Sequence, residues 1–191
     1  MKVSIVITVL NEEETVGRLL DSLLIQTKKA DEMIVVDGGS NDKTVEIING
    51  YQKKSVMRVF IELGSIAHGR NFGIKRAKFP IIAQIDAGCV AKADWLEKLI
   101  DPFQRRDVEV VAGFYVMTGD SALQRAVKPF LGIPREQFTP DTFLPSARSM
   151  AFKKSTWKKI GGFSEKLEIT GEDTLFSYNI IKMGIKIVRV K

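Results

Sequence analysis

The feature that most constrains this sequence is the alternation of short apolar runs with stretches that have helical periodicity. Runs rich in valine and isoleucine predict strands at residues 3–10, 33–36, 56–61, 81–85, 108–116, 147–152 and 185–190. Helical patterns lie between them, and one amphipathic face is formed by Val16, Leu19, Leu20, Leu23 and Leu24. Strands that alternate with helices form right-handed βαβ units. We therefore expect an α/β fold with a mainly parallel central sheet flanked by helices.

Local signals predict where the helices begin and end. Asn11, with Glu14 three residues later, resembles a capping box, so a helix is expected to begin there. Asp94 is expected to cap a later helix, and Gly184 to end the helix predicted over residues 172–183. The residues of that last helix expected to face the core are Leu175, Phe176, Ile180 and Met183.

Composition limits the number of domains and the kinds of partner. With 191 residues, 45% of them apolar, the chain can bury one sizeable core, so a single domain over residues 1–191 is expected. The net charge of +6 indicates an anionic partner, such as nucleotide phosphates, nucleic acid or an acidic membrane face, or else a solvated lysine-rich surface. Nucleic acid is disfavoured, because the chain has no motif that combines basic and aromatic residues.

The cysteine count and the apolar runs bear on location. Cys89 is the single cysteine, which excludes an internal disulfide and indicates a reducing, cytoplasmic setting. No run approaches about 18 apolar residues, so we expect a soluble chain, with the cytoplasmic face of a membrane as a second location. The strand-like run that ends at Lys191 suggests a truncated C-terminus.

Carboxylates stand at the ends of the expected elements. Asp37 and Asp86 each follow a buried strand, and Glu172 and Asp173 open a helix. Parallel sheets bind ligands outside the carboxyl ends of their strands, so topology gathers such side chains at one edge. The sequence therefore predicts a cleft for a charged, hydroxyl-rich ligand.

Five motifs follow one another along nearly the whole chain. They are the Asn11-Glu12 turn after the first strand, Asp37-Gly38-Gly39-Ser40-Asn41-Asp42-Lys43-Thr44, Arg70-Asn71-Phe72-Gly73, Asp86-Ala87-Gly88, and Gly161-Gly162-Phe163 followed by Glu172-Asp173. Each is weak alone, but their order and spacing together resemble glycosyltransferase family 2. This resemblance implies the GT-A fold and an inverting nucleotide-sugar transferase.

The resemblance also implies a donor site. Its donor-binding residues would be Thr8, Leu10, Asn11, Glu12, Asp37, Gly38, Arg70, Asp86, Ala87 and Arg148. The turn of residues 8–12 would hold the uridine, Asp37 would accept the uracil imide N–H, and Arg70 would neutralise diphosphate charge. From the residues alone, Asn11 and Glu12 could simply cap a helix, Asp37 could open a turn, and Arg70 could be a surface cation.

In the family, the last Asp of Asp-x-Asp ligates Mg²⁺ or Mn²⁺, and the implied cofactor here is one of these ions with Asp86 as its ligand. Gly88 stands in the last position, however, and Cys89 is a soft ligand that suits Mg²⁺ poorly. The ion could be held by Asp86, diphosphate oxygens and water. Alternatively Arg70, Arg148 or a lysine replaces it.

The resemblance makes Asp173 the general base, with Glu172 supporting it. In an inverting transfer a carboxylate must take the proton of the attacking hydroxyl within hydrogen-bond reach. The plainer interpretation of this pair is that acidic residues stabilise the start of a helix through its dipole. No role is predicted for His68, the single histidine.

Residues 118–145 break the rhythm and are rich in proline, so we expect a long excursion over the sheet, of the kind that forms lids or binding loops. The aromatic residues that could form an acceptor platform, or simply belong to the core, are Phe130, Phe138, Phe143 and Trp157. Residues 1–117 would form the nucleotide-sugar-binding half, and residues 118–191 the acceptor and catalytic-base half.

The expected function is transfer of a sugar from a nucleotide donor, a UDP-sugar, to an acceptor hydroxyl or a lipid phosphate with inversion. The expected partners are this donor and a saccharide or lipid-linked acceptor. The incomplete Asp-x-Asp motif leaves a non-catalytic nucleotide-sugar-binding domain as the alternative. A nucleotidyltransferase ranks last, because the acidic run Glu12-Glu13-Glu14 after the first strand would repel a triphosphate.

Overall fold

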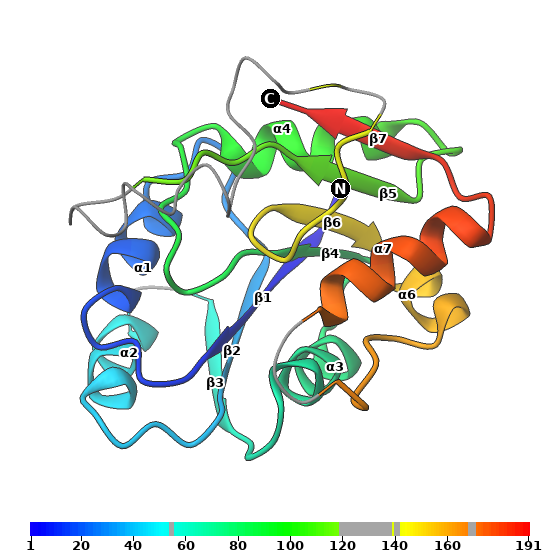
Figure 1. The fold of residues 1–191 in the computed structure, drawn as a ribbon. Coiled ribbons are helices and arrows are strands. Elements are labelled where there is room, and N and C mark those ends of the chain that lie inside the picture. The colour runs from blue at the N-terminus through cyan, green and yellow to red at the C-terminus, as the bar shows by residue number, and fades with distance from the viewer. Residues whose placement is uncertain (54–55, 119–138, 140–141, 168–170) are drawn as a thin grey trace.

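A computed structural model describes residues 1–53, 56–118, 139, 142–167 and 171–191. The described residues form a seven-stranded sheet in the order β3-β2-β1-β4-β6-β5-β7 (Figure 1). The strands are β1 (Val3–Val9), β2 (Glu32–Asp37), β3 (Met57–Ile61), β4 (Ile81–Gln84), β5 (Val110–Gly113), β6 (Met150–Lys153) and β7 (Ile187–Val190). Only the pairs made by β6, with β4 and with β5, are antiparallel. The predicted α/β fold with a mainly parallel sheet is confirmed.

Helices cover both faces of this sheet, as Figure 1 shows. They are α1 (Val16–Leu24), α2 (Thr44–Gln52), α3 (Ile66–Arg76), α4 (Trp95–Ile100), the 3-10 turn η1 (Asp101–Gln104), α6 (Lys154–Ile160) and α7 (Glu172–Lys182). One buried cluster joins the sheet to α1, α2 and α4, and a second joins it to α3, α6 and α7. The sheet is therefore the middle of three layers, with a core on each side.

The expected start of the first helix is wrong. That helix begins at Val16, and Asn11 instead adopts a left-handed conformation with φ 54°. Asn11 Oδ1 accepts a hydrogen bond from Asn41 N at 2.9 Å, and Asn11 N donates one to Ser40 Oγ at 2.8 Å. Asparagine tolerates this backbone region better than most residues. Asn11 thus ties the loop after β1 to the loop after β2 rather than capping a helix.

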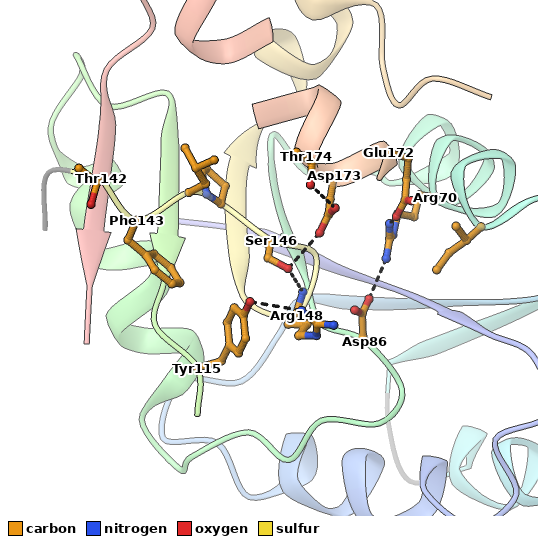
Figure 2. Close-up of a pocket in the computed structure, with 13 residues that line it drawn as sticks. Arg70, Asp86, Tyr115, Thr142, Phe143, Ser146, Arg148, Glu172, Asp173 and Thr174 are labelled. Atoms are coloured by element: carbon orange, nitrogen blue, oxygen red, sulfur yellow. Dashed lines mark hydrogen bonds and ion pairs between the residues drawn. The ribbon is translucent and has the colours of Figure 1, made fainter. Parts of the chain in front are cut away.

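The predicted strand over residues 147–152 is also shifted. β6 begins at Met150, and a tight turn precedes it in which Ser149 N donates to Ser146 O at 2.9 Å. In Figure 2 Ser146 points towards Asp173, and the guanidinium of Arg148 lies between Tyr115 and Asp86. The strand prediction missed this turn, which depends on the pairing of Ser146 with Ser149.

In α7, Phe176 and Ile180 are buried as predicted, and Gly184 follows the helix with φ +67°. Met183 is 44% exposed, because α7 ends one residue earlier, so its predicted inward position is wrong. Most of the predicted excursion, including Phe130 and Phe138, lies outside the described residues. Among the described residues no helix is both long and apolar enough to cross a bilayer.

Candidate functional site

A cavity of about 570 Å³ opens where β4, α3, α7 and the turn before β6 meet. Its lining residues include Ile66, Arg70, Asp86, Tyr115, Phe143, Ser146, Arg148, Glu172, Asp173 and Thr174 (Figure 2). This volume lies within the usual range of small-molecule sites. The cavity brings together five carboxylate or guanidinium residues expected from sequence, from four separate parts of the chain: Arg70, Asp86, Arg148, and the neighbours Glu172 and Asp173.

Arg70 is the buried centre of this charge cluster. Its side chain is 3% exposed, so the surface-cation interpretation is wrong. Its guanidinium donates to Asp86 Oδ1 at 2.9 Å and to Glu172 Oε1, and it lies 5.7 Å from the centroid of the Phe163 ring. Charge-assisted bonds of this kind fix geometry strongly. Arg70 thereby holds the end of β4 to the start of α7.

Asn71, the next residue, holds the turn formed by the Gly161-Gly162-Phe163 motif. Its Nδ2 donates to Phe163 O at 2.8 Å, and its Oδ1 accepts from Phe163 N at 2.9 Å and from Trp157 Nε1 at 3.2 Å. Gly162 has φ +78°, and a Cβ there would lie 2.9 Å from Asn71 Oδ1. The Arg-Asn and Gly-Gly-Phe motifs are therefore two sides of one contact, a pairing that sequence alone does not show.

Asp173, the expected base, projects from the first turn of α7 into the cavity. Its Oδ2 accepts hydrogen bonds from Ser146 Oγ at 3.0 Å and from Ala147 N at 3.3 Å. Within the described part of the chain, Oδ1 accepts only a long hydrogen bond from the Thr174 hydroxyl, at 3.5 Å. One carboxylate oxygen is thus fixed by protein donors, and the other is available to a ligand. Sequence reasoning missed Ser146, although the Pro145-Ser146 pair is a turn signal.

Arg148 and Tyr115 line another part of the cavity wall. Tyr115, like Ser146, belongs to none of the sequence motifs. Arg148 Nη1 donates to the Tyr115 hydroxyl at 3.2 Å, and its guanidinium lies 5.3 Å from the centroid of that ring. Burial lowers the pKa of Arg148, but the Tyr115 hydrogen bond and the nearby charges of Asp86 and Asp173 outweigh it and raise that pKa overall. Arg148 is therefore a permanent cation at the cavity wall.

Asp37 lies at the same edge of the sheet but turns inward. It is fully buried, and its carboxylate accepts hydrogen bonds from Gly39 N, Ser40 N and Ser40 Oγ. This geometry fits the interpretation that Asp37 opens a turn. The contact between Asp37 and uracil stays a prediction.

The other donor-binding candidates lie around the adjacent end of β1 and do not line the cavity. Glu12 Oε2 accepts a hydrogen bond from Thr15 Oγ1 within its own turn. Leu10 is 54% exposed next to Gly38, whose N–H donates to Val9 O at 2.9 Å. The remaining candidates are Thr8, which packs under α3, Asn11 in its loop-to-loop contact, and the buried Ala87. These residues lie in or follow β1, β2 and β4, which are neighbours in the sheet.

Two of the four aromatic candidates for an acceptor platform are described, and both are core residues. Phe143 is buried and packs against the rings of Phe114 and Tyr115, although it also contributes to the cavity wall. Trp157 is 8% exposed and hydrogen-bonded to Asn71. The core interpretation therefore holds for these two.

The residues around Asp86 fit a divalent metal ion poorly. Gly88 offers no side-chain ligand, and Arg70 occupies Oδ1 of Asp86. Burial, and then the charge of Asp86, raises the pKa of the Cys89 thiol to about 11, so Cys89 stays protonated. The part of the chain that the structure describes holds no cluster of three or more His, Cys, Asp or Glu side chains suited to a metal. A hard cation that requires several oxygen ligands finds one carboxylate oxygen here.

Comparison with known proteins identifies the fold and the family. Two solved transferases superpose on the whole fold: TarS of S. aureus in complex with UDP-GlcNAc, and the mannosyltransferase PcManGT of Pyrobaculum calidifontis in complex with GDP-Man and Mn²⁺. Their TM-scores are both 0.77, their identities 21% and 20%, and they cover 100% and 99% of this chain but 56% and 54% of their own lengths. These likenesses confirm the GT-A fold.

An uncharacterized glycosyltransferase of Rickettsia typhi is 30% identical over 182 residues, which is 91% of this chain and 57% of that protein. The chain thus spans little more than half the length of these proteins. The model of the family described as glycosyl transferase family 2 matches residues 4–163. The chain belongs to glycosyl transferase family 2.

Proposed function

We propose that this chain transfers a sugar from a nucleotide donor, a UDP-sugar, to an acceptor hydroxyl or a lipid-linked phosphate with inversion. The family membership supports glycosyl transfer. The cavity supports the chemistry, because it joins a carboxylate with one uncommitted oxygen to a cluster of fixed charges. The proposed acceptor is a saccharide or a lipid-linked molecule.

The observation that carries this proposal is the position of Asp173. Its Oδ2 is fixed by Ser146 and Ala147, and Asp173 lines the same cavity as Asp86 and Arg148. In an in-line displacement the acceptor oxygen attacks the anomeric carbon as the bond to the nucleoside diphosphate breaks. Asp173 takes the acceptor proton at Oδ1. A base within hydrogen-bond reach contributes about 10²- to 10⁴-fold to the rate.

Glu172 plays a different part. Its carboxylate is buried against Arg70, so it is not free to accept the proton of an acceptor. It fixes Arg70, and through Arg70 the carboxylate of Asp86. Removing one partner of a buried ion pair leaves an uncompensated charge, which is strongly destabilising. Glu172 therefore supports the site by positioning Arg70 and Asp86.

The nucleotide lies along the ends of β1 and β2 in this proposal. Residues 8–12 and the loop opened by Asp37 and Gly38 contact the uridine, while Asp86 and Ala87 contact the ribose. Residues 1–117 then bind the donor, and residues 118–191 supply the base and the acceptor side. Support comes from topology, since β2, β1 and β4 are neighbours and their carboxyl ends share one edge.

A non-catalytic nucleotide-sugar-binding domain is the second candidate, because Gly88 leaves the Asp-x-Asp motif incomplete. The two candidates agree on donor binding and differ on turnover. The sequence analysis expects Mg²⁺ or Mn²⁺ as cofactor. The proposed transfer does not include this ion, because the described side chains around Asp86 fit it poorly.

Asp173→Asn tests the proposal. Release of UDP from a panel of UDP-sugars, with water or added saccharide as acceptor, should fall by about 100-fold or more, because an amide cannot take the proton. Thermal shift by UDP should be unchanged. Asp94→Asn is the matched control, because this exposed acid also stands at a helix start, and it should behave as wild type.

Two outcomes separate the candidates. Turnover by Asp173→Asn at the wild-type rate would remove Asp173 from the mechanism. Wild-type protein that is stabilised by UDP yet releases none from any sugar donor would favour the binding domain.

A further inference from the structure

The two arginines of the cavity differ in what already neutralises them. Arg70 is bonded to both Asp86 and Glu172. Arg148 donates to the neutral hydroxyl of Tyr115, and among the described residues it forms no ion pair within 4 Å. Arg148 is nevertheless half-buried in the cavity wall, where Figure 2 shows its guanidinium between Tyr115 and Asp86.

A half-buried guanidinium without a close counter-ion is unfavourable in the free protein. Desolvation of a charge costs free energy that an opposite charge in contact would offset. Asp86 and Asp173 act on Arg148 only through space. An anion bound in the cavity would complete this arrangement, and the planar guanidinium suits phosphate oxygens, which it can bind with two N–H groups.

Gly88 supplies an independent observation. A Cβ on Gly88 would meet no atom within 4 Å, and its φ is not in the left-handed region. Neither backbone geometry nor packing therefore requires glycine beside Asp86. An aspartate would fit, yet the chain carries no second carboxylate there, so the site lacks a metal ligand for which it has room.

We propose that Arg148 binds the diphosphate of the donor in place of a divalent metal ion, so that the chain binds its nucleotide without metal. This inference rests on the proposed function. As the acceptor oxygen bonds to the anomeric carbon, the bond from that carbon to the diphosphate oxygen breaks, and its electron pair stays on that oxygen. Arg148 stabilises the new charge by N–H donation and transfers no proton, while the acceptor proton goes to Asp173.

The first test is titration calorimetry of UDP and UMP into wild-type protein, in EDTA and in Mn²⁺. The dissociation constant for UDP should agree in the two buffers within about twofold. Arg148→Ala should weaken UDP binding by roughly 10- to 100-fold, the effect of losing hydrogen bonds to a charged group, and should weaken UMP less. Arg106→Ala, an exposed arginine in the loop after η1, is the control and should match wild type.

The second test adds a carboxylate at position 88, where the Asp-x-Asp motif would have its second aspartate. Gly88→Asp should weaken UDP binding in EDTA, because it places a second negative charge beside Asp86, and Mn²⁺ should restore it. Gly88→Asn has nearly the same shape without the charge and should show no response to Mn²⁺. This pair keeps the test valid even if Arg148→Ala does not fold.

The outcomes distinguish the two proposals. UDP binding by wild type that requires Mn²⁺, or that is indifferent to Arg148→Ala, would overturn the role of Arg148 and leave the proposed function standing. Failure of UDP, GDP and dTDP to bind in either buffer would overturn both.

Discussion

At the scale of single residues, the orientation of Asp173 depends on Ser146, which lies 27 positions earlier in the chain. Ser146→Ala removes a hydrogen bond worth about 0.5–1.5 kcal/mol, so the turnover number should fall roughly 3- to 10-fold.

The measurement is kcat and KM for wild type and Ser146→Ala. Ser146→Thr keeps the hydroxyl and should recover most of the rate. An unchanged kcat together with a raised KM would mean that Ser146 contacts substrate rather than positions the base.

His68 links two loops around the start of α3. Its Nε2 lies 3.0 Å from Glu62 Oε1, and its Nδ1 lies 3.0 Å from Glu165 Oε2. Hydrogen bonds to Glu62 and then Glu165 raise the pKa of His68 above its ordinary 6.5. Asn71, and then His68, lower the pKa of Glu165 below its ordinary 4.5. The ion pair between a protonated His68 and an ionised Glu165 therefore stabilises the fold.

The sign of the pH dependence follows from these shifts. The contribution of His68 is fully present below pH 6.5 and is lost as the pH rises through the raised folded-state pKa. That of Glu165 is fully present above pH 4.5 and is lost as the pH falls through the lowered pKa. The difference in melting temperature between wild type and His68→Gln should be largest between pH 4.5 and pH 6.5. It should be modest, because the imidazole is 35% exposed to solvent. A difference that stays constant as the pH is raised through neutrality would contradict this account.

At the scale of elements, α3 lies unusually close to the sheet. A Cβ on Gly73 would lie 2.7 Å from Cγ1 of Val6 and 3.1 Å from Cγ2 of Val36. Gly73→Ala should therefore destabilise the protein by about 1–3 kcal/mol, although alanine favours helix. Gly50 of α2 is the matched control: a Cβ there meets nothing within 4 Å, so Gly50→Ala should stabilise by about 0.5–1 kcal/mol. Urea denaturation measures both, and equal effects of the two changes would show that α3 can move away from β1.

Periodicity predicted the elements of the first half well, because each buried strand and each one-faced helix carries its own signal in adjacent residues. The errors lie where a distant partner decides the geometry. Asn11 looked like a cap, but loop contacts with residues 40 and 41 hold it. Residues 147–149 were predicted as the start of a strand, but they belong to the turn that positions Arg148.

At the scale of the whole molecule, the topology explains why carboxylates from distant parts of the chain share one cavity. β6 inserts antiparallel between β4 and β5, which brings the turn before it and the start of α7 beside the end of β4. The fold class and the positions of Asp86 and Asp173 could be predicted from motifs. The Arg70 ion pairs, the inward turn of Asp37 and the role of Ser146 could not, since each depends on contacts between remote segments.

The central claim is that these segments together form one donor site. Amide hydrogen exchange with and without a saturating UDP-sugar tests it most directly, since it reports each segment of the backbone separately. The account predicts slower exchange at residues 8–12, 37–40, 86–89, 146–149 and 171–174, with α1 unchanged. Protection confined to a surface away from the cavity, such as the contact of η1 with the end of β7, or no protection with any nucleotide sugar, would contradict it.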